Sequence, residues 1–151
     1  MSLITLEEAL SLRQGRKLVF TNGVFDILHA GHVEYLQAAR KLGDFLIVGL
    51  NSDASVRALG KGAGRPINPL EDRALVVGAL RCVDGVIGFE QTTPNALIEA
   101  LRPEVHVKGG DYDPESMPET PLVRSYGGEV VILPLRPGRS TTGILRKLAD
   151  S

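Results

Sequence analysis

The chain has 151 residues, 43% of them hydrophobic, which fits one folded domain. Its 17 lysines and arginines balance 18 aspartates and glutamates, and the net charge of −1 excludes the broad basic field with which proteins bind DNA or RNA. A single cysteine, Cys82, excludes an intramolecular disulfide. No secretory signal begins the chain and no apolar stretch approaches the ~20 residues needed to cross a bilayer, so we expect a cytoplasmic protein.

From residue 18 onward, apolar runs alternate with amphipathic stretches. In chain order, the pattern predicts a strand at 18–21, a helix ending near 43, a strand at 45–50, a short helix through 59, a helix at 69–80, a strand at 83–89, a helix opened by Thr93 and Pro94, strands at 104–108 and 129–133, and a last helix capped by Ser140. Prolines interrupt residues 109–121, where we expect no regular element. This alternation is typical of a Rossmann-like, doubly wound sheet of five parallel strands in a three-layer α/β/α domain, here spanning residues 1–151.

Polar clusters follow four of the predicted strands. They lie at residues 22–32, 51–53, 108–111 and 139–142. In open parallel sheets, ligands bind beyond the carboxyl ends of the strands, at the point where the strand order reverses. We therefore expect these clusters to form one binding site.

The most informative cluster contains His29 and His32, with Gly31 between them. Residues three apart share one face of a helix, and a helix N-terminus offers unpaired backbone N–H groups and a positive dipole end. Paired imidazoles at such a position predict a polyphosphate site, in which ring N–H groups stabilise developing negative charge. Zinc is the competing interpretation. It needs a third ligand, and the remaining histidine, His106, falls within an apolar strand, so we expect no bound metal site.

Residues 21–32 (TNGVFDILHAGH) resemble the signature of the cytidylyltransferase-like nucleotidyltransferases, which carry an H-x-G-H motif. Residues 51–56, 65–73, 107–112 and 140–142 extend the resemblance to the adenylyltransferase domain of the bacterial bifunctional heptose kinase/adenylyltransferases, which make the ADP-heptose of lipopolysaccharide. The resemblance implies transfer of AMP from ATP to a sugar phosphate, D-glycero-D-manno-heptose 1-phosphate, with release of pyrophosphate. No carboxylate cage for a metal is visible in the sequence, so we expect Mg²⁺ to be carried mainly by the nucleotide phosphates. The sequence departs from the bifunctional relatives in lacking the kinase domain that often precedes this one, so we expect a separate sugar kinase to supply the acceptor. The resemblance is also compatible with a homodimer.

The resemblance and the local patterns together assign roles to individual residues. Lys61 lies in a glycine-flanked basic loop, 60–66, suited to fold over a ligand, and Arg73 follows near the start of the next helix. The expected catalytic residues are His29, His32, Lys61 and Arg73. The expected nucleotide-binding residues are Asn22, Gly23, Val24, Phe25, Gly31, Lys108, Gly110, Asp111, Ser140, Thr141 and Thr142. Asp26 and Asp53 are expected to orient a histidine or face the acceptor, and Asp53 also suits a helix cap.

Three alternatives remain open at this stage. Glycerol-3-phosphate cytidylyltransferases share most of these motifs, so CTP with a small phosphate is one alternative. A short relative of the class I aminoacyl-tRNA synthetases is another, which the length and the charge balance disfavour. A non-catalytic nucleotide-binding module is the third, and the presence of His29, His32 and Lys61 speaks against it.

Overall fold

The computed structural model describes residues 3–60, 62–135 and 140–150. Within them, one sheet contains the parallel strands β1 (Leu18–Gly23), β2 (Phe45–Asn51), β3 (Gly85–Phe89), β4 (Val105–Gly109) and β5 (Glu129–Leu133). The strand order is β3-β2-β1-β4-β5. The chain passes from β1 outward through β2 to β3 and then returns to the other side of β1 as β4. The doubly wound parallel sheet is therefore confirmed, and its switch point lies between β1 and β4.

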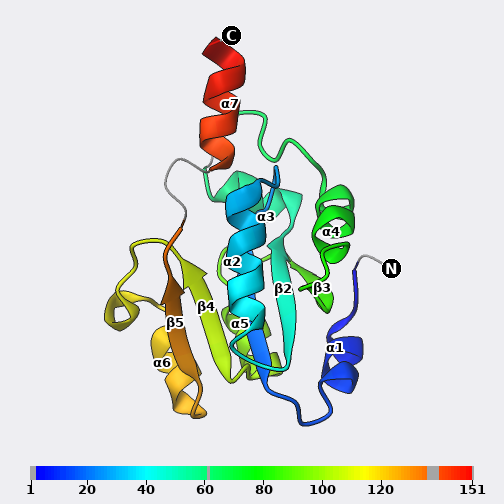
Figure 1. The fold of residues 1–151 in the computed structure, drawn as a ribbon, viewed down its shortest axis with the longest axis vertical. Coiled ribbons are helices and arrows are strands. Elements are labelled where there is room, and N and C mark those ends of the chain that lie inside the picture. Colours follow the sequence, from blue (N-terminus) through cyan, green and yellow to red (C-terminus); the bar gives the residue numbers. More distant parts are fainter. Residues whose placement is uncertain (1–2, 61, 136–139, 151) are drawn as a thin grey trace.

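Helices cover both faces of the sheet (Figure 1). On one face lie α2 (Ala30–Arg40) and α4 (Leu70–Gly78), and on the other lie α1 (Leu6–Arg13), α5 (Asn95–Leu101) and α6 (Thr120–Ser125). Alternate strand residues supply the two halves of the core because successive side chains point to opposite faces. The expected three layers are thus confirmed. Strand β2, in the central sheet, is buried along its whole length between the two helical layers.

Two helices lie at the carboxyl end of the sheet. Ser52 caps α3 (Asp53–Ala58) by accepting from the Ser55 amide, and Ser140 caps α7 (Thr141–Asp150) by accepting from the Gly143 amide at 2.9 Å. The Ser140 cap agrees with the sequence pattern, whereas α3 is capped by Ser52, and Asp53 is its first helical residue. In Figure 1, α7 projects beyond the rest of the domain, and none of its residues is buried. At its N-terminus, the Thr141 hydroxyl joins it to the Ile27 carbonyl oxygen.

Three short elements were not expected: α1, α6 and the 3₁₀ turn Pro114–Ser116. Helix α1 lacks a regular apolar stripe and buries only Ala9, but the capping box between Thr5 and Glu8 is a local signal for its start. The prolines of 109–121 do not exclude helix here, because a proline in the first turn of α6 loses no intrahelical hydrogen bond. Helix α5 begins at Asn95, one residue after the expected Pro94.

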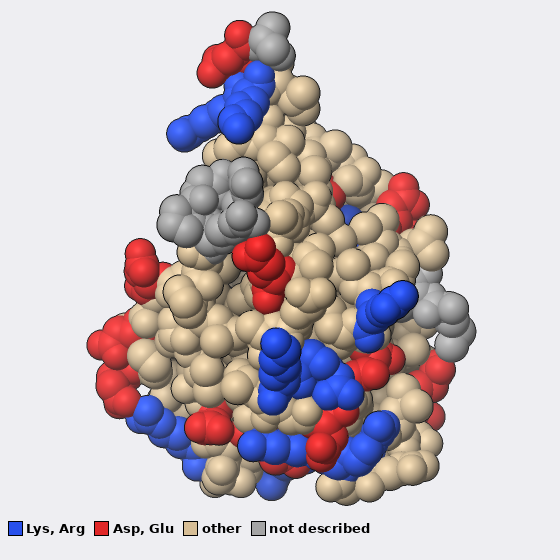
Figure 2. All heavy atoms as spheres, viewed as in Figure 1, with Lys and Arg blue, Asp and Glu red and all other residues tan. Residues whose placement is uncertain are grey.

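The surface agrees with the balanced composition. Figure 2 shows basic and acidic side chains interspersed on the face that it draws, with no single-sign field. Among the described residues, no helix is both long and apolar enough to traverse a lipid bilayer.

Candidate active site

A pocket of about 470 Å³ opens at the carboxyl ends of β1 and β4. The N-termini of α2 and α7 both contribute to its wall. The lining residues are Asn22, Gly23, Val24, Phe25, Asp26, His29, Gly31, His32, Tyr35, Arg65, Lys108, Gly109, Leu135, Ser140, Thr141 and Thr142. The pocket therefore occupies the switch point at which a ligand was expected.

His29 and His32 stack against each other in this pocket, with ring centroids 3.9 Å apart. His29 is the N-cap of α2, and its Nδ1 accepts a hydrogen bond from the Gly31 amide at 3.1 Å. The Nδ1 of His32 accepts from the His29 amide at 3.3 Å. Two backbone donors at the helix start are thus satisfied by the two imidazoles.

This capping arrangement assigns the tautomer of both rings. A nitrogen that accepts a hydrogen bond carries no proton, so each neutral imidazole holds its proton on Nε2. Burial first, and then the positive charge of a protonated His29, lower the pKa of His32 to about 4. At neutral pH, the His32 ring is therefore a neutral Nε2–H donor.

The lowered pKa of His32 predicts a loss of stability in mild acid. The unfolded chain, with a pKa of 6.5, binds the proton before the folded protein does, so the stabilisation present above that pH is lost as the pH falls toward 4. Because the ring is partly exposed, we expect about 1 kcal/mol between pH 7 and pH 5, roughly half of the full linkage value. Thermal unfolding at the two pH values checks this, and His32→Gln should reduce the difference. An equal loss in the variant would assign it to other groups.

The turn that follows β1 brings an aromatic ring, that of Phe25, against His32. Phe25 adopts a positive φ of 49°, which is uncommon for a residue with a side chain and marks local strain. Its ring lies 5.1 Å from that of His32. A Cβ on Gly23 would lie 2.9 Å from the Phe25 ring, so glycine is required for this packing. The motif at the end of β1 thus shapes the pocket as well as lining it.

The N-terminus of α7 places three hydroxyl groups at the pocket. Ser140 accepts from the Gly143 amide, and Thr141 Oγ1 donates to the Ile27 carbonyl oxygen at 3.1 Å. The Thr141 contact joins α7 to the segment that leads into α2. Hydroxyls and free amides at a helix start suit phosphate oxygens, as expected for these residues.

The β4 side of the pocket is tightly packed. Tyr35, one turn after His32 in α2, contacts Thr21 Oγ1 at 2.6 Å and donates to the Val107 carbonyl oxygen at 3.1 Å. A Cβ on Gly109 would lie 2.7 Å from Leu135 and 3.0 Å from the buried Tyr35 ring, so a larger residue there would have to displace these side chains. Lys108 Nζ lies 5.2 Å from the centre of the Tyr112 ring. On this side, Tyr35, Gly109 and Leu135 line the pocket together with Lys108.

Asp26 also lines the pocket, but its carboxylate holds a loop instead of a histidine. It accepts from the Ile67 amide at 2.8 Å, the Asn68 amide at 2.9 Å and Arg65 Nε at 2.8 Å. Burial alone would raise the pKa of Asp26, but these hydrogen bonds and the Arg65 charge lower it below its usual value. Asp26 is therefore an ionised anchor for residues 65–68.

Arg73 lies beneath the pocket and does not line it. Its side chain is fully buried and donates to the carbonyl oxygens of Val24 (2.9 Å), Asn51 (2.8 Å) and Asn68 (2.9 Å). Its remaining amino group donates to Asp53 Oδ1 at 2.7 Å. Arg73 and Asp53 therefore lie together under the site, where they join the ends of β1 and β2 to the 65–68 loop. The structure thus does not place Arg73 in the pocket with the other expected catalytic residues that it describes.

Other expected residues fall outside the pocket lining. Gly110 donates its amide to Leu133, and Asp111 is exposed. Lys61 is outside the described residues. Conversely, Tyr35 and Leu135 line the pocket and were not expected there. Tyr35 could have been predicted, because it follows His32 by three residues and therefore shares its face of the helix. Leu135 could have been predicted from its position just after the last strand.

Nothing in the described part of the chain resembles a zinc site. No group of three or more histidine, cysteine, aspartate or glutamate side chains there could hold a metal ion. His106 is fully buried in β4, stacked on Phe20 with its Nε2 3.5 Å from Glu119, away from the pocket lining. The imidazole pair is therefore not part of a described metal cluster.

Comparison with known proteins agrees with this geometry. The family model described as cytidylyltransferase-like matches residues 20–137. The chain is 56% identical to the D-beta-D-heptose 1-phosphate adenylyltransferase of Bordetella bronchiseptica, over 90% of this chain and 84% of that protein. It is 54% identical to the bifunctional protein HldE of Syntrophotalea carbinolica, over 91% of this chain but 28% of that protein. The chain thus spans little more than a quarter of the bifunctional relative.

Solved structures show the same architecture. The lipopolysaccharide core biosynthesis protein from Thermoplasma volcanium superimposes with a TM-score of 0.66 and 30% identity, over 81% of this chain and 98% of that one. Pantothenate synthetase from Thermus thermophilus superimposes with a TM-score of 0.63 over 99% of this chain and 71% of that one, at 18% identity. The second likeness concerns the fold alone.

Proposed function

Because the chain belongs to the cytidylyltransferase-like family, we propose that it transfers AMP from ATP to a heptose 1-phosphate and releases pyrophosphate. The observation that carries this proposal is the placement of both motif histidines in the switch-point pocket of a chain 56% identical to a heptose 1-phosphate adenylyltransferase. Neither the base nor the acceptor follows from the pocket alone. Both follow from the strength of that likeness.

In the proposed reaction, the base of ATP lies on the β4 side, near Gly109, and the phosphates lie over the N-termini of α2 and α7. An oxygen of the sugar phosphate attacks the α-phosphorus in line, a new P–O bond forms, and the bond to the β-phosphate breaks so that pyrophosphate leaves. The attacking oxygen is already ionised, so no general base is needed. His29 and His32 donate from Nε2 to phosphate oxygens and stabilise the charge that develops. Lys61 remains a proposed phosphate contact.

Mg²⁺ is the ion proposed to accompany ATP. The pocket carboxylate, Asp26, is already engaged by Arg65 and two amides. This donor set fits an ion held mainly by phosphate oxygens and water, and such an ion would neutralise part of the phosphate charge.

The acceptor's phosphate must come from a kinase reaction. A homodimer stays a prediction, checked by light scattering of the purified chain.

A pyrophosphate-release assay tests the proposed function. ATP and CTP are each paired with D-glycero-D-manno-heptose 1-phosphate and with glycerol 3-phosphate. We expect turnover with ATP and the heptose 1-phosphate to exceed the other three combinations. Preference for CTP and glycerol 3-phosphate would contradict the adenylyltransferase assignment. Nucleotide binding without turnover on any acceptor would indicate a non-catalytic module.

A further inference from the structure

Among the described residues that line the pocket, one lysine and one arginine lie on opposite sides of β1. Lys108 belongs to β4, on one side. Arg65 belongs to a loop tied to β2, on the other side, because Arg73 joins the Asn68 carbonyl to that of Asn51 at the end of β2. A nucleotide triphosphate and a phosphorylated acceptor bring two separate anionic groups. Arg65 lies on the side of β1 opposite the β4 side, to which the base of ATP is assigned in the proposed reaction.

Arg65 is held in place before any ligand binds. Its Nε donates to Asp26 Oδ2 at 2.8 Å, and its side chain is 11% exposed. Asp26 is itself fixed by the amides of Ile67 and Asn68, on the same loop as Arg65. The orientation of the guanidinium is therefore set by a closed ring of contacts between the β1 turn and the 65–68 loop. A preformed orientation lowers the entropy cost of binding a ligand.

The terminal amino groups of Arg65 are open to a ligand. Within the described residues, they donate to no protein acceptor, and neither is sealed from the pocket. The two groups form a planar fork that matches two oxygens of one phosphate. Because Asp26 balances the Arg65 charge, binding depends on these directed hydrogen bonds more than on net charge. Such a site selects an oxyanion with two free oxygens on one atom.

We propose that Arg65 binds the phosphate of the acceptor and that Asp26 is the positioning residue behind it. This inference rests on the proposed function. In the proposed reaction, the N-termini of α2 and α7 bind the nucleotide phosphates. The phosphate of the acceptor must approach the α-phosphorus from the side opposite the departing pyrophosphate, so it needs a separate binding contact. The fork holds two oxygens of the acceptor phosphate and leaves the third to attack the α-phosphorus.

Substitution of Arg65 separates the acceptor from the nucleotide. Arg65→Gln should raise KM for the heptose 1-phosphate by about 30-fold or more, as expected for loss of a charged bidentate contact, and leave the Kd of ATP within about twofold. Arg65→Lys should lose nearly as much, because one ammonium cannot replace the fork. Arg57→Gln, at an exposed position on α3, is the matched control and should change neither value. A weakened Kd for ATP, or an unchanged KM for the acceptor, would overturn the proposal.

A binding measurement distinguishes this inference from the proposed function. The wild type is titrated with the sugar phosphate in the presence of a non-hydrolysable ATP analogue, so no turnover is needed. Binding that depends on Arg65 in a protein without turnover would contradict the proposed function and support this inference. Normal turnover of the wild type, together with acceptor binding that Arg65→Gln leaves unchanged, would support the proposed function and contradict this inference.

A double-variant test addresses Asp26. If Asp26 acts through Arg65, Asp26→Asn should raise KM for the acceptor, and the Asp26→Asn, Arg65→Gln double variant should be no worse than Arg65→Gln. Additive losses of acceptor affinity would contradict the positioning role. Thermal unfolding of each variant identifies any loss that comes from folding alone.

Discussion

Replacing His29 or His32 with alanine is expected to lower kcat by on the order of 10²-fold or more, because each substitution removes an Nε2–H group that we propose donates to a phosphate oxygen of ATP. The two rings stack at 3.9 Å and hold each other's orientation, so the losses should not add in a double variant. Steady-state kinetics with ATP and the heptose 1-phosphate provide the measurement. Near-normal kcat in both single variants would contradict the role assigned to the imidazoles.

Asparagine at position 29 separates catalysis from helix capping. Its side-chain oxygen takes the place of Nδ1, which accepts from the Gly31 amide, but it offers no donor where Nε2 lies. We expect His29→Asn to keep the melting temperature close to that of the wild type and to lose activity as His29→Ala does. If His29→Asn were active, the imidazole at this position would serve the helix cap alone.

Replacing Arg73 with methionine is expected to destabilise the fold by about 3–5 kcal/mol, the cost typical of breaking a buried charged network. The substitution leaves the carbonyl oxygens of Val24, Asn51 and Asn68 without their donor in a buried place. For a chain of this length, the melting temperature should fall by roughly 10 °C. Calorimetry of the purified variant measures it, and activity should fall as well because the same carbonyls belong to segments around the pocket.

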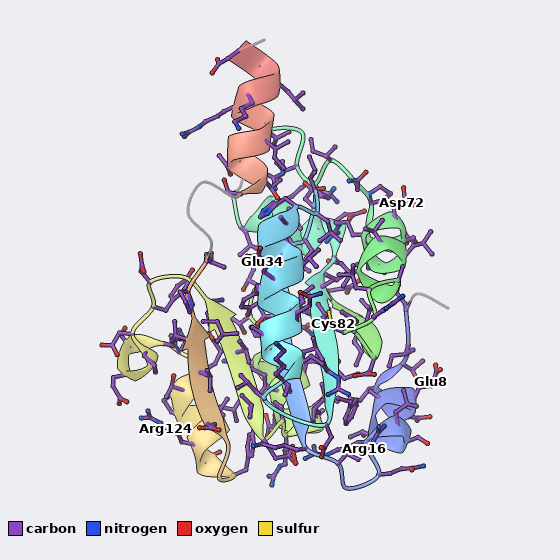
Figure 3. The ribbon with its side chains drawn as sticks, viewed as in Figure 1. Glu8, Arg16, Glu34, Asp72, Cys82 and Arg124 are labelled. Atoms are coloured by element: carbon purple, nitrogen blue, oxygen red, sulfur yellow. The ribbon has the colours of Figure 1, made fainter. Side chains whose placement is uncertain are left out.

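Arg124 provides a matched control for this prediction. It pairs with Glu115 on the surface, and Figure 3 labels it beside α6, at the opposite end of the molecule from α7. Its loss removes a solvent-screened ion pair, so Arg124→Met should leave the melting temperature within the error of the measurement. Equal losses in the two variants would contradict the role of Arg73 as a buried clamp.

Elements with a strong apolar period were predictable from the chain. All five strands lie within a few residues of their expected positions, because a buried parallel strand needs a continuous apolar run whatever surrounds it. Helix α1 was not predicted because only Ala9 is buried and its leucines are largely exposed. Helix α6 was not predicted because the prolines of residues 109–121 were interpreted as interruptions, although the last of them, Pro121, occupies the first turn of the helix.

Short-range patterns in the amino-acid sequence therefore specified the individual strands, the Ser140 helix cap and the imidazole pair after β1, since each depends on residues a few positions apart. The contacts of Arg73 and Arg65 could not be predicted from the sequence and are evident only in the folded structure. Arg73 meets Val24 across 49 positions, and Arg65 meets Asp26 across 39. An arginine on a helix or loop is usually a solvated charge, and only long-range packing removes water from it and supplies its acceptors. That physical difference explains why the histidine motif was predictable from the sequence, whereas the arginine contacts that hold the surrounding loops were not.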